Sequence, residues 1–262
     1  MRLAIHAEWT KLRTVRSTGW LVLAVVGCTV ATGALTTYSV DTSLCATPTS
    51  CDEDTVKLSL FGTYLGQVAV VMLAALAATT EYDTYLIRLT LAADPRRIRV
   101  LAAKAAVVCV VVLASATVGL LSSFAAARGI LPGNGFTAAN GYPPLSLGDG
   151  STLRAYGGTV LYFGLIGLLS LGVGTAVRHT AGALSTVLAL LFVTPIVAQF
   201  LNDPQVRDLL NKWSPMSAGL AIQATRRIGD LPIGPWAGLG VLAGYAAAAM
   251  LLGAVMFAVR DA

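Results

Sequence analysis

Six long apolar segments constrain the fold of this chain more than any other feature of its sequence. They cover about residues 18–40, 58–80, 98–127, 155–177, 181–202 and 234–259. A helix that crosses a bilayer needs about 20 largely apolar residues, because it rises about 1.5 Å per residue and the hydrocarbon core is about 30 Å thick. The pattern predicts an all-α integral membrane protein in which residues 1–262 form a single transmembrane domain of six helices.

Composition excludes the main alternatives to a membrane protein. Hydrophobic residues make up 56% of the chain and charged residues only 12%, whereas soluble domains have about 45–50% and about 25%. Disorder requires low hydrophobicity and high net charge, and this chain has neither. A seventh uncharged run, residues 129–148, contains five Gly and three Pro. We predict a loop there, because irregular backbone in lipid leaves polar groups unsatisfied.

The distribution of Lys and Arg predicts the orientation. Eleven of the 18 basic residues lie in the termini and in the two loops on the same side as the termini, and seven lie on the other side. Cytoplasmic loops carry the excess of positive charge in membrane proteins. Both termini are therefore expected in the cytoplasm. Arg outnumbers Lys 14 to 4 and Ala, Val, Leu and Gly dominate, which is typical of a GC-rich bacterial genome, so we expect a multi-pass protein of a bacterial plasma membrane. Basic residues that flank spans also account for the net charge of +5 without a nucleic-acid partner.

Two segments on the cytoplasmic side have helical patterns. Residues 1–16 place Ile5, Trp9 and Leu12 at helical spacing among basic residues, which indicates an interfacial amphipathic helix or, alternatively, an ordinary charged flank. In the loop 81–97, a short apolar face precedes Asp94 and Pro95, a pair typical of a helix start. This loop is either a docking segment for a partner or a positively charged anchor.

Two loops on the outer side also have informative patterns. Cys45 and Cys51 lie in a short polar loop that would face an oxidising compartment, so they are candidates for a disulfide, with two free thiols as the alternative. The loop 203–232 mixes apolar and charged residues and is interrupted near Pro215. We expect short or re-entrant helices there, and a soluble cap is the alternative.

The sequence lacks the residue patterns of several function classes. It contains no G-x-x-x-x-G-K-[ST] phosphate-binding loop, so any ATP hydrolysis must take place in a partner. The two His and four Cys do not form a metal-ligand pattern. No charged residue falls in the middle of a span, where an intramembrane enzyme or an ion-coupled transporter would need one. We therefore expect no catalytic residues, no metal and no cofactor bound by this chain.

Four segments resemble one family when they are taken in order along the six-span pattern. They are AEWTKLRTVRSTGW (7–20), EYDTYLIRLTLAADPRRIRVLAAK (81–104), GVGTAVRHTAGA (172–183) and PWAGLGVLAGYAAAA (235–249). Together they resemble actinobacterial permeases of the type-2 class of ABC exporters, some of which confer multidrug resistance. The resemblance extends over the whole chain.

This resemblance implies a set of partners and a coupling region. The partners would be two ABC ATP-binding subunits, which hold ATP and Mg, and a second permease copy that is expected to be identical. The segment 1–16 would be the elbow helix, and the loop 81–97 would carry the coupling helix. The residues expected to couple the permease to the ATPase are Glu81, Tyr85, Arg88, Asp94, Pro95, Arg96 and Arg97.

The resemblance also places the second and fifth spans near the dimer axis, where a substrate would pass. The candidate residues of this path are Phe61, Tyr64, Gln67, Met72, Phe192 and Gln199. A largely apolar lining with a few hydrogen-bonding groups suits a hydrophobic or amphipathic substrate, such as a drug, natural product or lipid. The alternative for each residue is packing or contact with lipid. The expected function is ATP-driven export by alternating access, and the alternative is a non-transporting sensor or scaffold subunit.

Overall fold

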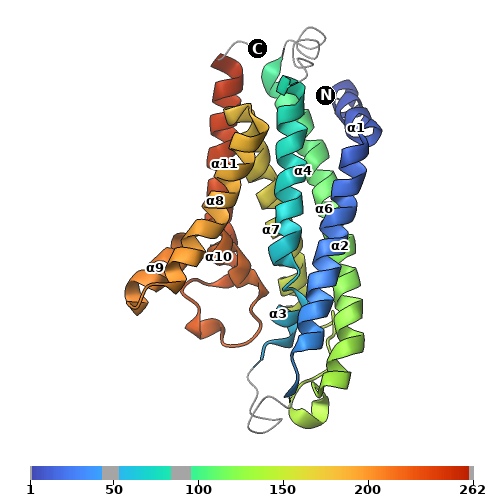
Figure 1. The fold of residues 1–262 in the computed structure, drawn as a ribbon, viewed down its shortest axis with the longest axis vertical. Helices are drawn as coiled ribbons and strands as arrows, with labels where there is room; N and C mark the ends of the chain where they lie inside the picture. Colours follow the sequence, from blue (N-terminus) through green and yellow to red (C-terminus); the bar gives the residue numbers. More distant parts are fainter. Residues whose placement is uncertain (1, 43–52, 84–95, 260–262) are drawn as a thin grey trace.

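Six long helices run along the molecule in the computed structural model, which describes residues 2–42, 53–83 and 96–259 (Figure 1). They are α2 (Arg16–Ser39), α4 (Thr63–Asp83), α6 (Arg97–Ile130), α7 (Gly150–Val177), α8 (Thr180–Gln199) and α11 (Pro235–Val259). Each is long and apolar enough to cross a membrane. The described part of the chain contains no strand. The predicted all-helical class and the number of spans are confirmed.

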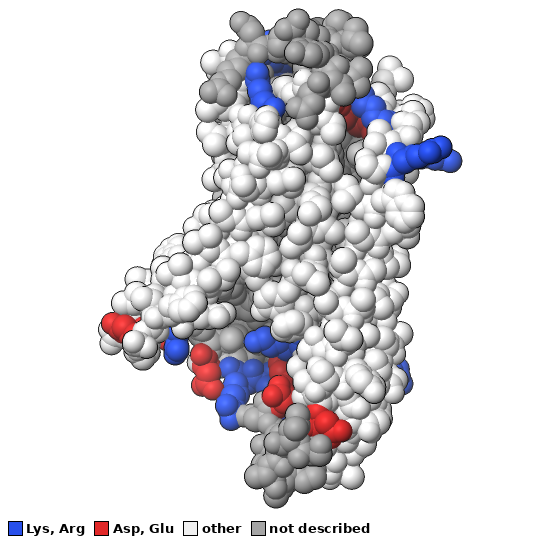
Figure 2. Space-filling view, viewed as in Figure 1, with Lys and Arg blue, Asp and Glu red and all other residues white. Residues whose placement is uncertain are grey.

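The two ends of the bundle differ from its middle in charge. The start of α1 (Arg2–Thr14) and the end of α11 lie together at one end, which we call the terminal end, and the opposite end is the distal end (Figure 1). Figure 2 shows Lys, Arg, Asp and Glu gathered at these two ends, with a broad uncharged belt between them. Charged side chains avoid the hydrocarbon core because leaving water is costly for them. The chain is therefore a multi-pass membrane protein.

The short helices other than α1 lie toward the distal end. They are α3 (Thr55–Ser59), α9 (Pro204–Trp213), α10 (Pro215–Leu220) and the 3-10 turns at Leu131–Asn134, Ala138–Asn140, Ala221–Gln223 and Ile228–Asp230. Ser214 separates α9 from α10, and its side chain accepts a hydrogen bond from the backbone N–H of Ser217, while Pro215 occupies the first helical position. This is a favourable helix start. It lets the chain change direction between α9, which is exposed, and α10, which is mostly buried.

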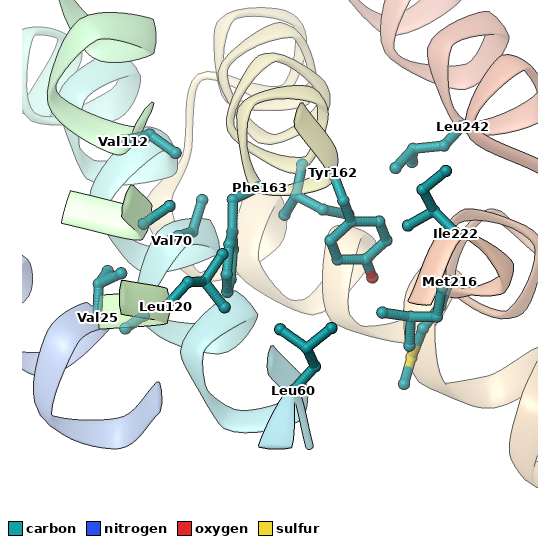
Figure 3. Close-up of a cluster of buried hydrophobic side chains, with 14 of the residues drawn as sticks. Val25, Leu60, Val70, Val112, Leu120, Tyr162, Phe163, Met216, Ile222 and Leu242 are labelled. Carbon is teal, nitrogen blue, oxygen red and sulfur yellow. The ribbon is translucent and has the colours of Figure 1, made fainter. Parts of the chain in front are cut away.

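Helix α7 is the centre of the bundle and packs against α4, α6, α8 and α11. Its side chains reach two sides of the core (Figure 3). Phe163 points toward Val70 and Leu120, whereas Tyr162 points toward Met216 and Ile222, and both rings are fully buried. A helix that is apolar around its whole circumference belongs in a protein core or in a membrane, and α7 is largely enclosed by its neighbouring helices.

Glycine allows α7 and α11 to approach closely. A Cβ atom on Gly172 would lie 2.5 Å from the carbonyl carbon of Ala249, and one on Gly253 would lie 2.7 Å from the carbonyl oxygen of Gly172. Gly62 and Gly66 make a similar approach to Thr29 on α2. Close backbone contact is a main source of helix association in lipid, where the hydrophobic effect between helices is absent.

Alanine substitution should distinguish glycines at helix contacts from those in open space. Gly172→Ala forces α11 away from α7, so we expect it to lower the free energy of unfolding by about 1–3 kcal/mol. Gly244→Ala is the control, because an added Cβ there meets no described atom within 4 Å. Reversible unfolding in mixed micelles measures both variants. Equal stability of the two variants would contradict the proposed role of Gly172.

Candidate functional site

Two carboxylates and two ammonium groups form a cluster at the terminal end. Lys104 Nζ lies 2.6 Å from Glu81 Oε1 and 2.9 Å from Glu8 Oε2. Lys11 Nζ lies 2.7 Å from Glu8 Oε1 and 3.0 Å from Glu81 Oε1. Each positive group therefore contacts both negative groups. We call Glu8, Lys11, Glu81 and Lys104 the ion cluster.

The ion cluster is largely removed from solvent. Glu8, Glu81 and Lys104 are 4%, 5% and 8% exposed, and only Lys11 reaches the surface. Burial alone would lower the pKa of the Lys11 ammonium, but the carboxylates of Glu8 and Glu81 outweigh burial and raise it above its ordinary value. Charges in such surroundings must compensate one another, since an unpaired buried ion costs several kcal/mol. Equal numbers of opposite charges meet this requirement.

The ion cluster joins three helices that are distant in sequence. Glu8 and Lys11 come from α1, Glu81 from the last turn of α4, and Lys104 from the second turn of α6. Lys104 also donates a hydrogen bond to the carbonyl oxygen of Ala77 on α4, at 3.1 Å. Because α4 and α6 are the helices that flank residues 84–95, the cluster ties both flanks of this segment to the N-terminal helix.

Two arginines hold the end of α11 at the same end of the bundle. Arg97 donates to the carbonyl oxygen of Phe257 at 2.9 Å, and Arg178 donates to that of Met256 at 3.1 Å. Cations are favourable there because the last carbonyl groups of a helix carry partial negative charge. The Arg178 guanidinium also lies 5.1 Å from the ring centre of Tyr82 on α4. The ends of α4, α6, α7 and α11 are thus cross-linked by polar contacts.

The structure places only some of the residues predicted to couple the chain to an ATPase. Glu81 belongs to the ion cluster, Arg97 binds the end of α11, and Arg96 is exposed just before α6. Tyr85, Arg88, Asp94 and Pro95 lie outside the described residues, as do the disulfide candidates Cys45 and Cys51. The role of each of these residues stays a prediction.

Three predicted path residues meet at a cavity near the distal end. Tyr64 of α4 and Phe192 and Gln199 of α8 line a space of about 250 Å³ together with Pro195, Ile196, Met216, Ser217 and Leu220. A larger space of about 520 Å³ shares Tyr64 and Gln199 and extends toward α3, α9 and residues 231–233. We call the two spaces together the distal cavity, with the smaller one as its apolar chamber and the larger one as its mouth.

The other predicted path residues lie outside the lining of the distal cavity. Phe61 is 45% exposed, and its ring centre lies 4.9 Å from that of Tyr64. Gln67 is fully buried, accepts a hydrogen bond from the Tyr162 hydroxyl at 2.5 Å, and directs its amide nitrogen to the Met216 sulfur at 3.5 Å. Met72 is 37% exposed on α4. None of these three side chains lines the cavity.

Two polar side chains, Asp54, which is half-buried, and Gln223, which is buried, hold the loop that forms one wall of the distal cavity. The Asp54 carboxylate accepts hydrogen bonds from the backbone N–H groups of Thr225 and Arg226, at 2.6 and 3.0 Å, and from the Thr225 hydroxyl at 2.7 Å. The Gln223 amide donates to the hydroxyls of Thr63 and Thr159, at 3.0 and 3.3 Å. Since buried polar groups require such partners, these contacts determine where the loop lies.

Sequence reasoning missed the ion cluster and the two basic residues at the mouth of the distal cavity, Lys57 and Arg207. The spacing of Glu8 and Lys11 indicates a pair on one helix face. No local signal connects that pair to Glu81 and Lys104, which are distant in sequence.

Comparison with known proteins adds no further assignment. No family model and no curated protein matches this chain. The functional interpretation therefore rests on the sequence pattern and on the geometry described above.

Removal of one member of the ion cluster should destabilise the protein strongly. Lys104→Ala leaves Glu8 and Glu81 with Lys11 as their only basic partner in the cluster, so we expect a loss of about 3–5 kcal/mol in the free energy of unfolding. Arg128→Ala is the matched control, because Arg128 is an exposed residue near the other end of the same helix. Unfolding in mixed micelles measures both. Similar small losses in the two variants would show that the cluster contributes little.

Proposed function

We propose that this chain is the transmembrane permease subunit of an ATP-driven ABC exporter. It forms the path for a hydrophobic or amphipathic substrate and works by alternating access, together with two ATP-binding subunits and a second permease copy. The terminal end faces the cytoplasm, the distal end faces outward, and the membrane is a bacterial plasma membrane. Hydrolysis of ATP takes place in the partner, because the chain has no phosphate-binding loop.

The ion cluster is the observation that carries this proposal. A partner that pushes on residues 84–95 can move a permease only if the flanking helices respond as one body. The contacts of Lys104 with Glu81 and Glu8 connect α4 and α6 to α1 at the place where this is required. In a low-dielectric environment such contacts resist separation, because separation would leave charges unpaired.

The contacts at the end of α11 extend this body across the bundle. Arg97 and Arg178 link α6 and α7 to α11, and Arg178 also contacts Tyr82 of α4. A displacement applied at the terminal end would therefore reach α7, the central helix, and α11. Alternating access in transporters is largely a rigid-body motion of this kind around a binding site. The distal cavity, at the opposite end, is where the path would open outward.

Two short segments have positions that suit the membrane interface. Helix α9 is exposed along its length, whereas α10 is mostly buried among α7, α8 and α11. We propose that α9 lies on the outer leaflet and that α10 is the re-entrant element before the last span. At the cytoplasmic side, α1 is the elbow helix, held by the ion cluster.

Co-purification tests the proposed class of protein. We expect a tagged chain, extracted from its native membranes in mild detergent, to retain a soluble subunit with a phosphate-binding loop in a ratio of one to one. Mass spectrometry of the complex identifies the subunit. Repeated isolation without such a partner would favour a sensor or scaffold subunit instead.

A charge substitution tests the coupling region within that complex. Arg88→Ala together with Arg96→Ala should reduce transport in proteoliposomes by about tenfold, as expected for the loss of a coupling energy between sites. Arg97 is left intact because it holds α11. Arg128→Ala is the control. The double variant must lose transport while its thermal stability stays unchanged. Full transport in the double variant would argue against docking at this loop.

A further inference from the structure

We infer that the distal cavity binds an amphipathic anion, with a phosphate or carboxylate group at the mouth and an apolar body in the chamber. The inference that the bound molecule is also transported rests on the proposed function. The inference that the cavity binds an anion does not depend on the proposed function.

The charged residues that line the mouth of the cavity are all basic. Lys57 of α3 and Arg207 of α9 contribute to the lining, and no Asp or Glu does. Neither basic side chain has a hydrogen-bond or ion-pair partner among the described residues. Lys57 and Arg207 thus remain available for an anion.

Nearby carboxylates are engaged in other contacts or do not line the cavity. Asp54 is occupied by the backbone of Thr225 and Arg226, and Asp203 caps α9 by accepting from the N–H of Gln205. Figure 2 shows a hollow beneath α9 at the distal end, bordered by charged side chains of both signs. Because the basic side chains line the cavity and the acidic ones do not, the charged groups that a bound molecule contacts there are basic.

The chamber supplies the apolar half of the site. Phe192 and Ile196 of α8 and Met216 of α10 surround it, while Tyr64, Gln199 and Ser217 lie where chamber and mouth join. The mouth, at about 520 Å³, lies in the range of sites for drug-sized ligands, which is about 300–1,000 Å³, and the chamber adds about 250 Å³. Hydroxyl and amide groups between an apolar end and a cationic end fit a molecule with one anionic head group.

The chemistry of the two basic groups favours oxyanions. A guanidinium presents parallel N–H donors that match phosphate or carboxylate oxygens, and an ammonium adds a second positive charge. An amphipathic cation of the same size would meet repulsion at the mouth. Two sources supply such anions, namely the head group of an acidic lipid and a soluble amphiphile.

Binding of paired probes tests the inference. The full-length chain is placed in nanodiscs of phosphatidylcholine, and radiolabelled dodecyl phosphate and dodecyltrimethylammonium are compared, with empty nanodiscs as the blank. We expect saturable binding of the phosphate at least about tenfold tighter than that of the ammonium probe, the equivalent of one charge-assisted contact. Equal binding of the two probes would overturn the inference.

Variants connect the selectivity to the cavity. Lys57→Gln with Arg207→Gln should abolish the preference for dodecyl phosphate. Lys212→Gln, which removes one positive charge from α9 outside the cavity lining, should retain it. Both native residues in the double variant are exposed, so folding is expected to survive, and thermal unfolding verifies this. A preference that persists in the double variant would place the site elsewhere and refute the assignment.

A last comparison identifies the source of the anion. If nanodiscs with equimolar phosphatidylglycerol displace dodecyl phosphate, the site is one for lipid head groups, and if they do not, it is one for a soluble amphiphile. Failure of selective binding in a chain that co-purifies with an ATPase overturns only the anion site. Selective binding by a chain that does not co-purify with an ATPase overturns only the proposed permease function.

Discussion

The absence of water in the middle of a bilayer is the constraint on which the rest of this structure depends. Backbone groups there must bond within their own helix, and charges must either leave or neutralise one another. Six uninterrupted helices satisfy the requirement on the backbone, and the uncharged belt shows that charges have left the middle of the bundle (Figures 1 and 2). Since lipid offers no hydrophobic drive for helix association, the helices are held by close packing, as where Gly172 of α7 meets Ala249 of α11.

Charges that remain near the terminal end are arranged as mutual partners. Glu81 and Lys104 face each other between α4 and α6, and Glu8 and Lys11 complete the set from α1. This arrangement stabilises the fold and also restricts motion, because a relative shift of the three helices would separate buried opposite charges. In the proposed permease, the terminal end therefore moves as one rigid body when the ATPase acts on it.

The distal end follows a different rule. There, the half-buried Asp54 is satisfied by the loop at Thr225, and the buried Gln223 of this loop is satisfied by Thr63 of α4. Lys57 and Arg207 are not satisfied in this way and line the mouth of a cavity. A molecule whose charges are paired at one end, and whose other end has a cavity with only basic charged residues in its lining, is suited to receive force at one side and a ligand at the other.

The sequence alone determined that the chain is all-helical, that it has six spans, and about where each span lies. These properties are local, because a run of apolar residues of sufficient length requires a membrane helix whatever its neighbours are. The motif resemblance likewise follows from the order of residues, and the function that it implies stays a proposal. Tyr64, Phe192 and Gln199, chosen from the sequence, do line one cavity. Gln67, chosen with them, is turned to Tyr162 and Met216 instead.

Only the tertiary structure decided which residues become partners. Glu81 and Lys104 lie 23 positions apart, and Glu81 and Lys11 lie 70 apart, so neither pairing has a periodic signature. The pair Gly62 and Gly66 is used for a close helix contact, whereas Gly240 and Gly244, with the same spacing, face open space among the described residues. The physical reason is that spacing determines the face a residue occupies on its helix, but helix packing determines what that face meets.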